Sequence, residues 1–247
     1  ATSFLILGLA MGSVLTAGVF ALIIGGQGAG SQKTVLKLAH VLPAIAPVHL
    51  AMEYMAEKAA EKSGGLVEIQ VFPNGQLGSE TETIEQMQRG ALAMVKASTA
   101  PMEGFIPEMA VFSVPYLFRD ENHYWKVLDG EIGKGILRKG AEVGIRGLCY
   151  YDSGARSFYT VEKPILTPDD LKGMKIRVMR SKTAMDMIDT LGGSPTPIPF
   201  GELYTALQQS MVDGAENNPP SMYDTRHWEV AKHYSMDEHA RIPDIVL

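Results

Sequence analysis

Arg156 and Arg177 are the residues of this sequence best suited to bind a ligand. Each is expected where an extended segment meets a polar loop, and an Asp-Gly-Ala-Glu-Asn-Asn run follows at residues 213–218. A guanidinium keeps its charge and presents parallel N–H groups that match the two oxygens of a carboxylate. Two arginines from neighbouring segments, with the amide of Asn217, would surround a small carboxylate from several directions. The pattern predicts capture of an organic acid.

The same three residues also have plainer explanations. Arg177 alternates with the apolar residues Ile176 and Val178, which places it on the polar face of a strand, and most arginines are exposed. Arg156 would then be a loop charge, and Asn217 would satisfy a turn. Alternation alone favours a solvent-exposed Arg177.

Glu80, His40, Lys96 and Phe200 are the remaining candidates. Glu80 is expected in the first turn of a helix, where the dipole favours a negative charge with or without a ligand. His40 is expected at a strand end, where a structural role is the more common one. Lys96 lies inside an apolar run and therefore needs a cleft or an anionic partner. Phe200 is either a core ring or the wall of a pocket.

Enzymatic and metal chemistry have no support in the sequence. His227, His233 and His239 are six residues apart, a spacing that does not place pairs on one helical face. No GxSxG, Walker or CxxC motif is present. The single cysteine, Cys149, lies in an apolar run and is expected to be a small buried hydrophobe. We expect no catalysis, no metal and no cofactor.

The composition is that of an ordinary globular protein. The 247 residues are 46% hydrophobic and 20% charged, which suffices for one large or two modest domains. The formal net charge of -6, without a Lys/Arg run, disfavours a nucleic-acid partner. A small anion remains compatible with this charge, because a cleft is governed by its own few donors.

Residues 4–24 are uncharged and mostly apolar, and a small-residue segment follows at 25–31. We interpret residues 1–31 as a signal peptide or membrane anchor plus linker, since the apolar run is long enough to span a bilayer. The glycines at 25–30 lack the GxGxxG spacing of a dinucleotide site. Export, and hence a periplasmic location, is expected.

The first half of the chain alternates strands with helices. We expect strands at 34–40, 67–71 and 91–98, and helices at 48–59 and 79–90. Short connections between such elements predict a mostly parallel sheet covered by helices. Ligands bind beyond the carboxyl ends of its strands, where His40, Ser98 and Glu80 fall.

The second half repeats the alternation. We expect a helix over 120–142 with Trp125 and Leu128 in the core, an extended pair at 145–151 and 157–161, strands at 174–178 and 213–217, and helices at 184–191 and 203–211. The break at 152–155 is expected to be a hinge. The fold class is α/β with two lobes, lobe I being 32–152 and 243–247 and lobe II 153–242. The apolar final residues predict a chain truncated inside a buried strand.

Several ordered strings carry a family resemblance. They are LKGMKIRV at 171–178, GGSPTPIPFGELYTALQQ at 192–209, VDGAENN at 212–218, QLGSE at 76–80 and VPYLF at 114–118. From about Leu36 to its last residue the chain strongly resembles the DctP family, the substrate-binding proteins of tripartite ATP-independent periplasmic (TRAP) transporters. The resemblance implies a Venus-flytrap protein that closes on an organic acid and passes it to the small and large TRAP membrane subunits. The family normally continues with further helices, one of which bridges the lobes.

The resemblance also implies roles by position. Arg177 matches the principal carboxylate-binding arginine, Arg156 a common second arginine, and Asn217 the asparagine that completes the grip. Glu80 matches an acidic position that takes ligand hydroxyls.

Three further positions match the family's pocket, two of them less generally. Phe200 matches a pocket-wall aromatic, and His40 and Lys96 lie near pocket positions. Because an acidic residue accepts hydroxyl protons and repels a second carboxylate, Glu80 and Lys96 favour a sugar acid such as a uronate over a C4-dicarboxylate. A membrane-anchored sensor domain for a small carboxylate is the alternative interpretation.

Overall fold

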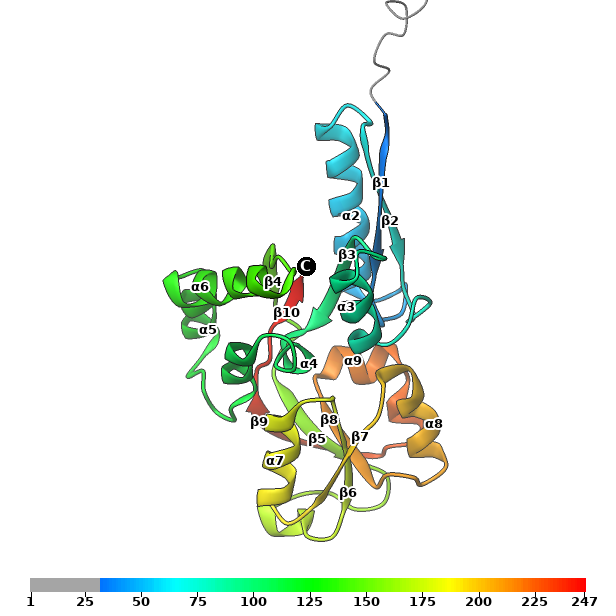
Figure 1. The fold of residues 1–247 in the computed structure, drawn as a ribbon. Helices are drawn as coiled ribbons and strands as arrows, with labels where there is room; N and C mark the ends of the chain where they lie inside the picture. Colours follow the sequence, from blue (N-terminus) through cyan, green and yellow to red (C-terminus); the bar gives the residue numbers. More distant parts are fainter. Residues whose placement is uncertain (1–31) are drawn as a thin grey trace, which may run out of the picture.

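The computed structural model describes residues 32–247, which form two α/β lobes, each built around a five-stranded sheet (Figure 1). The strand order is β2-β1-β3-β10-β4 in lobe I and β7-β6-β8-β5-β9 in lobe II. The expected signal or anchor segment, 1–31, lies outside the described residues. Within the described part, none of the helices combines the length and apolar character needed to cross a membrane.

Lobe I begins with the expected strand and helix alternation. Strands β1 (Thr34–Ala39), β2 (Val67–Phe72) and β3 (Met94–Ser98) are parallel and are linked by helices α2 (Pro47–Lys62) and α3 (Glu80–Gln88). Helix α3 starts at a capping box, because Glu82 N donates to Ser79 Oγ and Ser79 N donates to the Glu82 carboxylate at 2.8 Å. The box sets Glu80 at the first position of the helix.

The sheet of lobe I is completed by two strands distant in sequence. Strand β10 (Asp244–Val246) pairs antiparallel with β3 on one side and with β4 (Cys149–Tyr151) on the other. The sheet is therefore mixed beyond β3. Strand β4 is its edge, which explains why Cys149 is exposed and not buried as expected.

The expected single helix at 120–142 is divided into shorter pieces. They are α5 (Glu121–Leu128), α6 (Glu131–Lys139) and the 3-10 turn η2 (Gly140–Val143); α4 (Thr99–Met102) and η1 (Pro107–Ser113) precede them. The chain turns tightly between α5 and α6. A Cβ at Gly133 would lie 2.1 Å from the carbonyl oxygen of Leu128, so the turn requires glycine at this position. Leu128 is buried and Trp125 packs against the core, as predicted.

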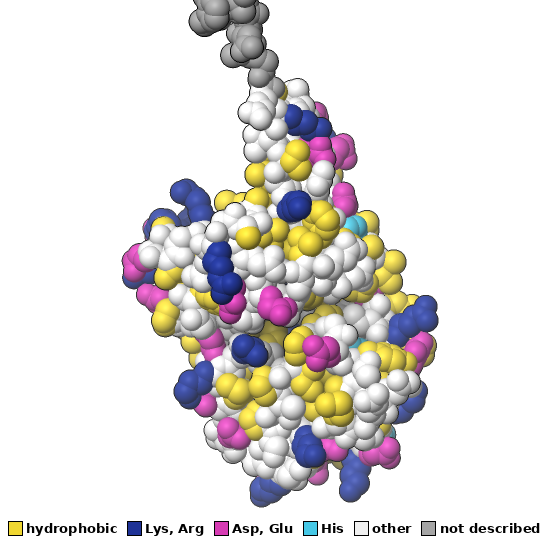
Figure 2. All heavy atoms as spheres, turned by 45° about the vertical axis from the view of Figure 1, so that its right-hand side comes forward, with side chains coloured by type: hydrophobic (Ala, Val, Ile, Leu, Met, Phe, Trp, Pro, Cys, Tyr) yellow, Lys and Arg dark blue, Asp and Glu magenta, His cyan; other side chains and the backbone are white. Residues whose placement is uncertain are grey.

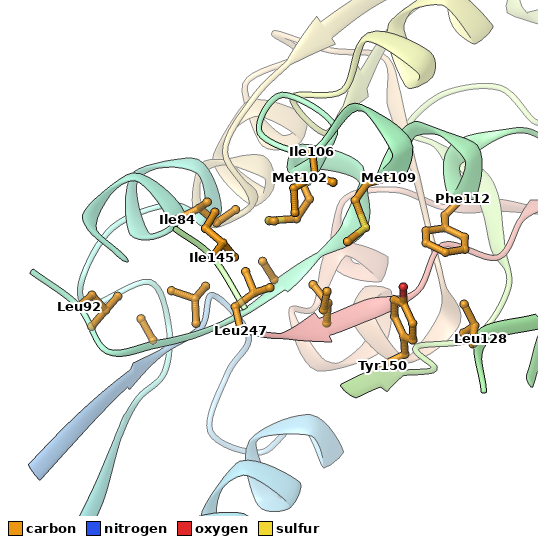
Figure 3. Packing of buried hydrophobic residues seen from close by; sticks show 14 of the residues in the cluster. Ile84, Leu92, Met102, Ile106, Met109, Phe112, Leu128, Ile145, Tyr150 and Leu247 are labelled. Atoms are coloured by element: carbon orange, nitrogen blue, oxygen red, sulfur yellow. The ribbon is translucent and has the colours of Figure 1, made fainter. Parts of the chain in front are cut away.

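The main core of lobe I joins segments that are distant in sequence (Figure 3). Ile84 of α3, Met102 of α4 and Phe112 of η1 pack with Tyr150 of β4 and with Leu247 after β10. The last residues of the chain are thus part of this core.

Lobe II has its own sheet, covered on both faces. Its elements are β5 (Arg156–Thr160), η3 (Pro168–Leu171), β6 (Lys175–Val178), α7 (Lys182–Thr190), β7 (Ser194–Pro197), η4 (Phe200–Glu202), α8 (Leu203–Gln208), β8 (Gly214–Asn217), α9 (Pro219–Asp224), η5 (His227–Glu229) and β9 (His233–Ala240). Strands β7, β6 and β8 are parallel, whereas β5 is antiparallel to β8 and β9. Phe158 and Tyr159 of β5 belong to different core clusters, so each face of the sheet is packed.

The expected pairing of 145–151 with 157–161 is wrong. Strand β4 lies in the sheet of lobe I and β5 in the sheet of lobe II, so residues 152–155 cross between the lobes. The return crossing joins β9 to β10 at residues 241–243. Two crossings connect the lobes within the described residues.

Candidate ligand-binding cleft

A cavity between the two lobes contains six of the seven predicted site residues. Its lining includes Glu80, Lys96, Arg156, Arg177, Phe200 and Asn217. An adjoining hollow of about 370 Å³ shares Glu80, Arg177 and Phe200 with it, so the two form one continuous cleft. The structure therefore brings together residues from β3, α3, β5, β6, η4 and β8.

Arg177 lies at the junction of the two hollows and is only 2% exposed. Its Nε donates to Ile198 O at 2.8 Å, and its guanidinium lies 5.8 Å from the centre of the Phe200 ring. Nη1 is buried without a hydrogen-bond partner among the described residues. Burial lowers the pKa of Arg177 from its ordinary value. The solvent exposure favoured by alternation is wrong, because β6 is flanked by β7 and β8 and both sheet faces are covered.

Arg156 is buried on β5 and is held by Glu216 of β8. Its Nε donates to Glu216 Oε2 at 2.5 Å and its Nη2 to Oε1 at 2.9 Å, a bidentate pair. Nη2 also donates to Glu216 O at 2.8 Å, and Nη1 to Asn217 Oδ1 at 2.9 Å. Four of the five guanidinium N–H groups are thus used within the protein.

Asn217 is oriented by the same network. Its Oδ1 accepts from Arg156 Nη1 and from the backbone N–H of Asn218, each at 2.9 Å. Two donors on Oδ1 determine which end of the amide is oxygen, so the NH₂ group remains for the cleft. Asn217 therefore offers donors and no acceptor there.

Next to Arg156, Glu216, His239 and Asp237 form a chain of polar groups that was not predicted from the sequence. His239 Nδ1 lies 2.7 Å from Asp237 Oδ2, and its Nε2 lies 3.6 Å from Glu216 Oε2, beyond hydrogen-bonding distance. Burial raises the pKa of Glu216, but Arg156 and His239 outweigh it and hold this pKa at about 2. Burial alone would lower the pKa of His239, but the carboxylates of Asp237 and Glu216 outweigh burial and raise this pKa above its ordinary value. Glu216 lies inside a buried strand, and an acidic residue at such a position indicates a buried cationic partner.

The lobe I side of the cleft is acidic. Glu80 Oε1 accepts the N–H of Ser98 at 2.9 Å, and burial raises the pKa of Glu80. Lys96 Nζ lies 2.6 Å from Asp244 Oδ2, with both side chains less than a tenth exposed. Ser153 Oγ donates to the same oxygen. Asp244 was also missed, because nothing near it in sequence indicates a partner on β3.

His40 is the predicted site residue that does not line the cavity. It is 2% exposed, its Nε2 lies 3.1 Å from His49 Nδ1, and it is not among the residues that line the cavity. Burial, with the positive charge of Lys96 and with His49, lowers the pKa of His40 to about 4. The structure thus separates His40 from the other six candidates.

Charge on the outside is dispersed. On the face shown in Figure 2, Lys and Arg side chains are scattered among Asp and Glu without a broad basic field. Among residues 32–247, no group of three or more His, Cys, Asp and Glu side chains is arranged to hold a metal ion.

The described residues thus form two α/β lobes joined by crossing segments, with buried cations facing the gap between the lobes. The family model of DctP, the bacterial extracellular solute-binding proteins of family 7, matches residues 38–247, and the chain belongs to this family. It is 44% identical to the uncharacterized protein YiiZ of Salmonella typhimurium, covering 87% of this chain and 66% of that one. The chain spans between 59% and 66% of the length of three curated relatives.

Two solved structures are similar in fold. A TRAP periplasmic solute-binding protein from Bradyrhizobium, in complex with D-galacturonate, is 47% identical with a TM-score of 0.84, covering 86% of this chain and 71% of that one. A TRAP periplasmic solute-binding protein from Sulfurospirillum deleyianum, with bound succinate, is 33% identical with a TM-score of 0.84, covering 87% and 69%.

Proposed function

We propose that this chain is the binding region of an extracytoplasmic solute-binding protein that captures a sugar acid and delivers it to a TRAP transporter. The observation that carries the proposal is Arg177, a buried cation in the cleft whose Nη1 lacks a partner among the described residues. An unpaired buried donor on a charged group is costly, and an anionic ligand would relieve that cost.

Arg177 is the principal carboxylate ligand in this proposal. Its Nε is committed to Ile198 O, so the carboxylate would meet the edge formed by Nη1 and Nη2. Arg156 contributes less than the resemblance implies, because Glu216 and Asn217 leave it one free N–H. Asn217 adds its NH₂ group. The lobe II side carries two arginines and one glutamate. Their net charge is one positive charge, which a single ligand carboxylate would neutralise.

The energetics are adequate for tight binding. A hydrogen bond to a charged group contributes about 1.5 to 3 kcal/mol, and micromolar affinity requires roughly 8 kcal/mol before ordering costs. Three or four such bonds from Arg177, Arg156 and Asn217 would supply much of this. Closure of the lobes around the ligand would exclude water and strengthen them.

Substitution of Arg177 by Lys in the full-length protein tests the assignment. Lysine keeps the charge but loses the fork, and we expect affinity for D-galacturonate or D-glucuronate to fall by about a hundredfold, equivalent to one or two charged hydrogen bonds. Isothermal titration calorimetry measures this. Arg138→Lys, at an exposed position on α6, is the matched control and should bind as the unmodified protein does. Equal affinity of the Arg177 variant would exclude this role.

Export and delivery are parts of the same proposal. Mass spectrometry of the mature amino terminus distinguishes an exported binding protein, which loses its apolar leader, from a membrane-anchored sensor, which retains it. The proposed division of the lobes, 32–152 with 243–247 and 153–242, places both hinges at the crossings. Recovery of the bound acid chemically unchanged would distinguish capture from catalysis.

A further inference from the structure

Asp244 presents a carboxylate oxygen to the cleft from an unexpected place, the return strand of lobe I. Its Oδ2 is taken by Lys96 at 2.6 Å and by the hydroxyl of Ser153. Its Oδ1 makes none of the hydrogen bonds found among residues 32–247, although Asp244 is only 6% exposed and lines the cavity. One oxygen is therefore immobilised while the other is left to accept.

Glu80 repeats this arrangement beside it. Its Oε1 is fixed by the N–H of Ser98, and Oε2 has no partner among the described residues. Ser98 is also the register partner of Asp244 in the pairing of β3 with β10, so the two carboxylates flank one residue. The negative charge of Asp244 contributes to the raised pKa of Glu80, after burial, which agrees with this proximity.

The two sides of the cleft therefore differ in charge and in hydrogen-bonding sense. The arginines and Asn217 offer donors, whereas Glu80 and Asp244 offer acceptors and, with Lys96, sum to one negative charge. A hydroxyl group donates to a carboxylate, but a second ligand carboxylate would be repelled by it. Two solved structures, one with D-galacturonate and one with succinate, each have a TM-score of 0.84 in comparison with this chain. Because the backbones are so similar, the choice between a sugar acid and a dicarboxylate must depend on side chains.

We infer that Asp244 is a specificity-determining residue which, together with Glu80, accepts hydrogen bonds from ligand hydroxyls and selects polyhydroxy monocarboxylates over dicarboxylates. Asp244 and Glu80 form the acceptor wall of the cleft, and Lys96 keeps Asp244 in place. The inference rests on the proposed function, because it presumes that Arg177 takes the carboxylate. It concerns the opposite end of the ligand.

Asp244→Asn in the full-length protein is the primary test. The amide keeps the shape and the Ser153 contact but leaves Lys96 without its counter-charge, which favours a second carboxylate. We expect D-galacturonate affinity to fall about tenfold to a hundredfold, the range of one hydrogen bond to a charged group, and succinate affinity to rise. Calorimetry with both acids gives the ratio. Glu80→Gln, which spares the ion pair, should shift the ratio in the same direction.

Asp189→Asn is the matched control, because Asp189 is exposed on α7, away from the cleft lining. An unchanged ratio of sugar-acid to succinate affinity in both cleft variants, with sugar-acid binding intact, would refute the role of Asp244 while leaving the proposed function standing. Failure of the unmodified protein to bind any carboxylate would instead refute the proposed function. Equal weakening for both acids would show a structural role only, and would also overturn the inference.

Discussion

At the scale of single residues, Glu216 is the reason why Arg156 can be buried without a ligand. The bidentate pair and the backbone oxygen of Glu216 satisfy most of the guanidinium, and His239 Nε2 lies 3.6 Å from Glu216 Oε2. A buried charge without its partner is strongly destabilising, whereas loss of the whole pair can be nearly neutral.

Glu216→Gln should therefore lower the free energy of unfolding by about 3 to 5 kcal/mol, because Arg156 loses its counter-charge in a dry environment. Urea denaturation at pH 7 measures the change. Joint replacement by Arg156→Met and Glu216→Leu should cost clearly less than the single change. A single variant as stable as the unmodified protein would show that the pair is not needed to keep Arg156 buried.

Arg177 and Asn217 lie in the strings that carry the family resemblance, and Arg156 was predicted from its position after the break at 152–155; the structure places all three in one cleft. Their partners were not predictable, because Glu216 lies 60 positions from Arg156 and only tertiary pairing brings the two together. Strand alternation misplaced Arg177 because it assumes one wet face, an assumption that fails for a strand between two others in a covered sheet.

At the scale of elements, the sequence predicted those elements that are stabilised by interactions between residues close in sequence. Helix α3 was predictable from Ser79 and Glu82, which form its capping box. Strands β7 and β9 were not expected: β7 contains two prolines and is tolerated because it is an edge strand, and β9 is largely polar. Their pairing with neighbours decides their conformation.

The two interlobe crossings are joined by an ion pair. Arg241, between β9 and β10, donates through Nε to Asp152 Oδ1 at 3.2 Å and through Nη2 to Oδ2, and its guanidinium lies 5.1 Å from the centre of the Tyr124 ring. Asp152 Oδ1 also accepts the N–H of Gly154 at 2.8 Å, within the outgoing crossing. The pair therefore links the two crossing segments to each other.

A double-mutant cycle with Arg241→Gln and Asp152→Asn should give a coupling energy of about 1 to 3 kcal/mol, since the pair is bidentate and mostly buried. Chemical denaturation of the four proteins provides the numbers. The exposed pair Lys182 and Asp186 on α7 is the control, for which roughly 0.5 kcal/mol or less is expected. Equal coupling in the two cycles would remove any special role for the pair between the crossings.

At the scale of the whole molecule, acid stability is limited by neutral buried histidines. Burial, reinforced by neighbouring positive charge, lowers the pKa values of His40 and His227 from 6.5 to about 4. The unfolded chain takes up protons near pH 6.5 and the folded one does not, so the stabilisation is complete above 6.5 and is lost as the pH falls towards 4.

Each histidine should account for about 3 kcal/mol of the stability lost between pH 7 and pH 4, from 1.36 kcal/mol per pKa unit. His227→Gln, which can keep a bond to the Tyr159 hydroxyl, should flatten the profile by that amount. Urea unfolding at several pH values tests this, with His233→Gln as the control. A parallel profile for the His227 variant would contradict the assignment.

The position of β10 has a consequence for how the molecule is assembled. Within residues 32–247, lobe II is continuous in sequence, whereas β3 and β4 of the lobe I sheet are joined through β10, which follows lobe II. Contacts between residues so far apart raise the contact order. The chain loses the entropy of loop closure before these contacts can stabilise the fold. Lobe II is thus able to fold early, whereas the sheet of lobe I is complete only after β10 has paired with β3 and β4. We expect the slow phase of refolding to correspond to this pairing of β10.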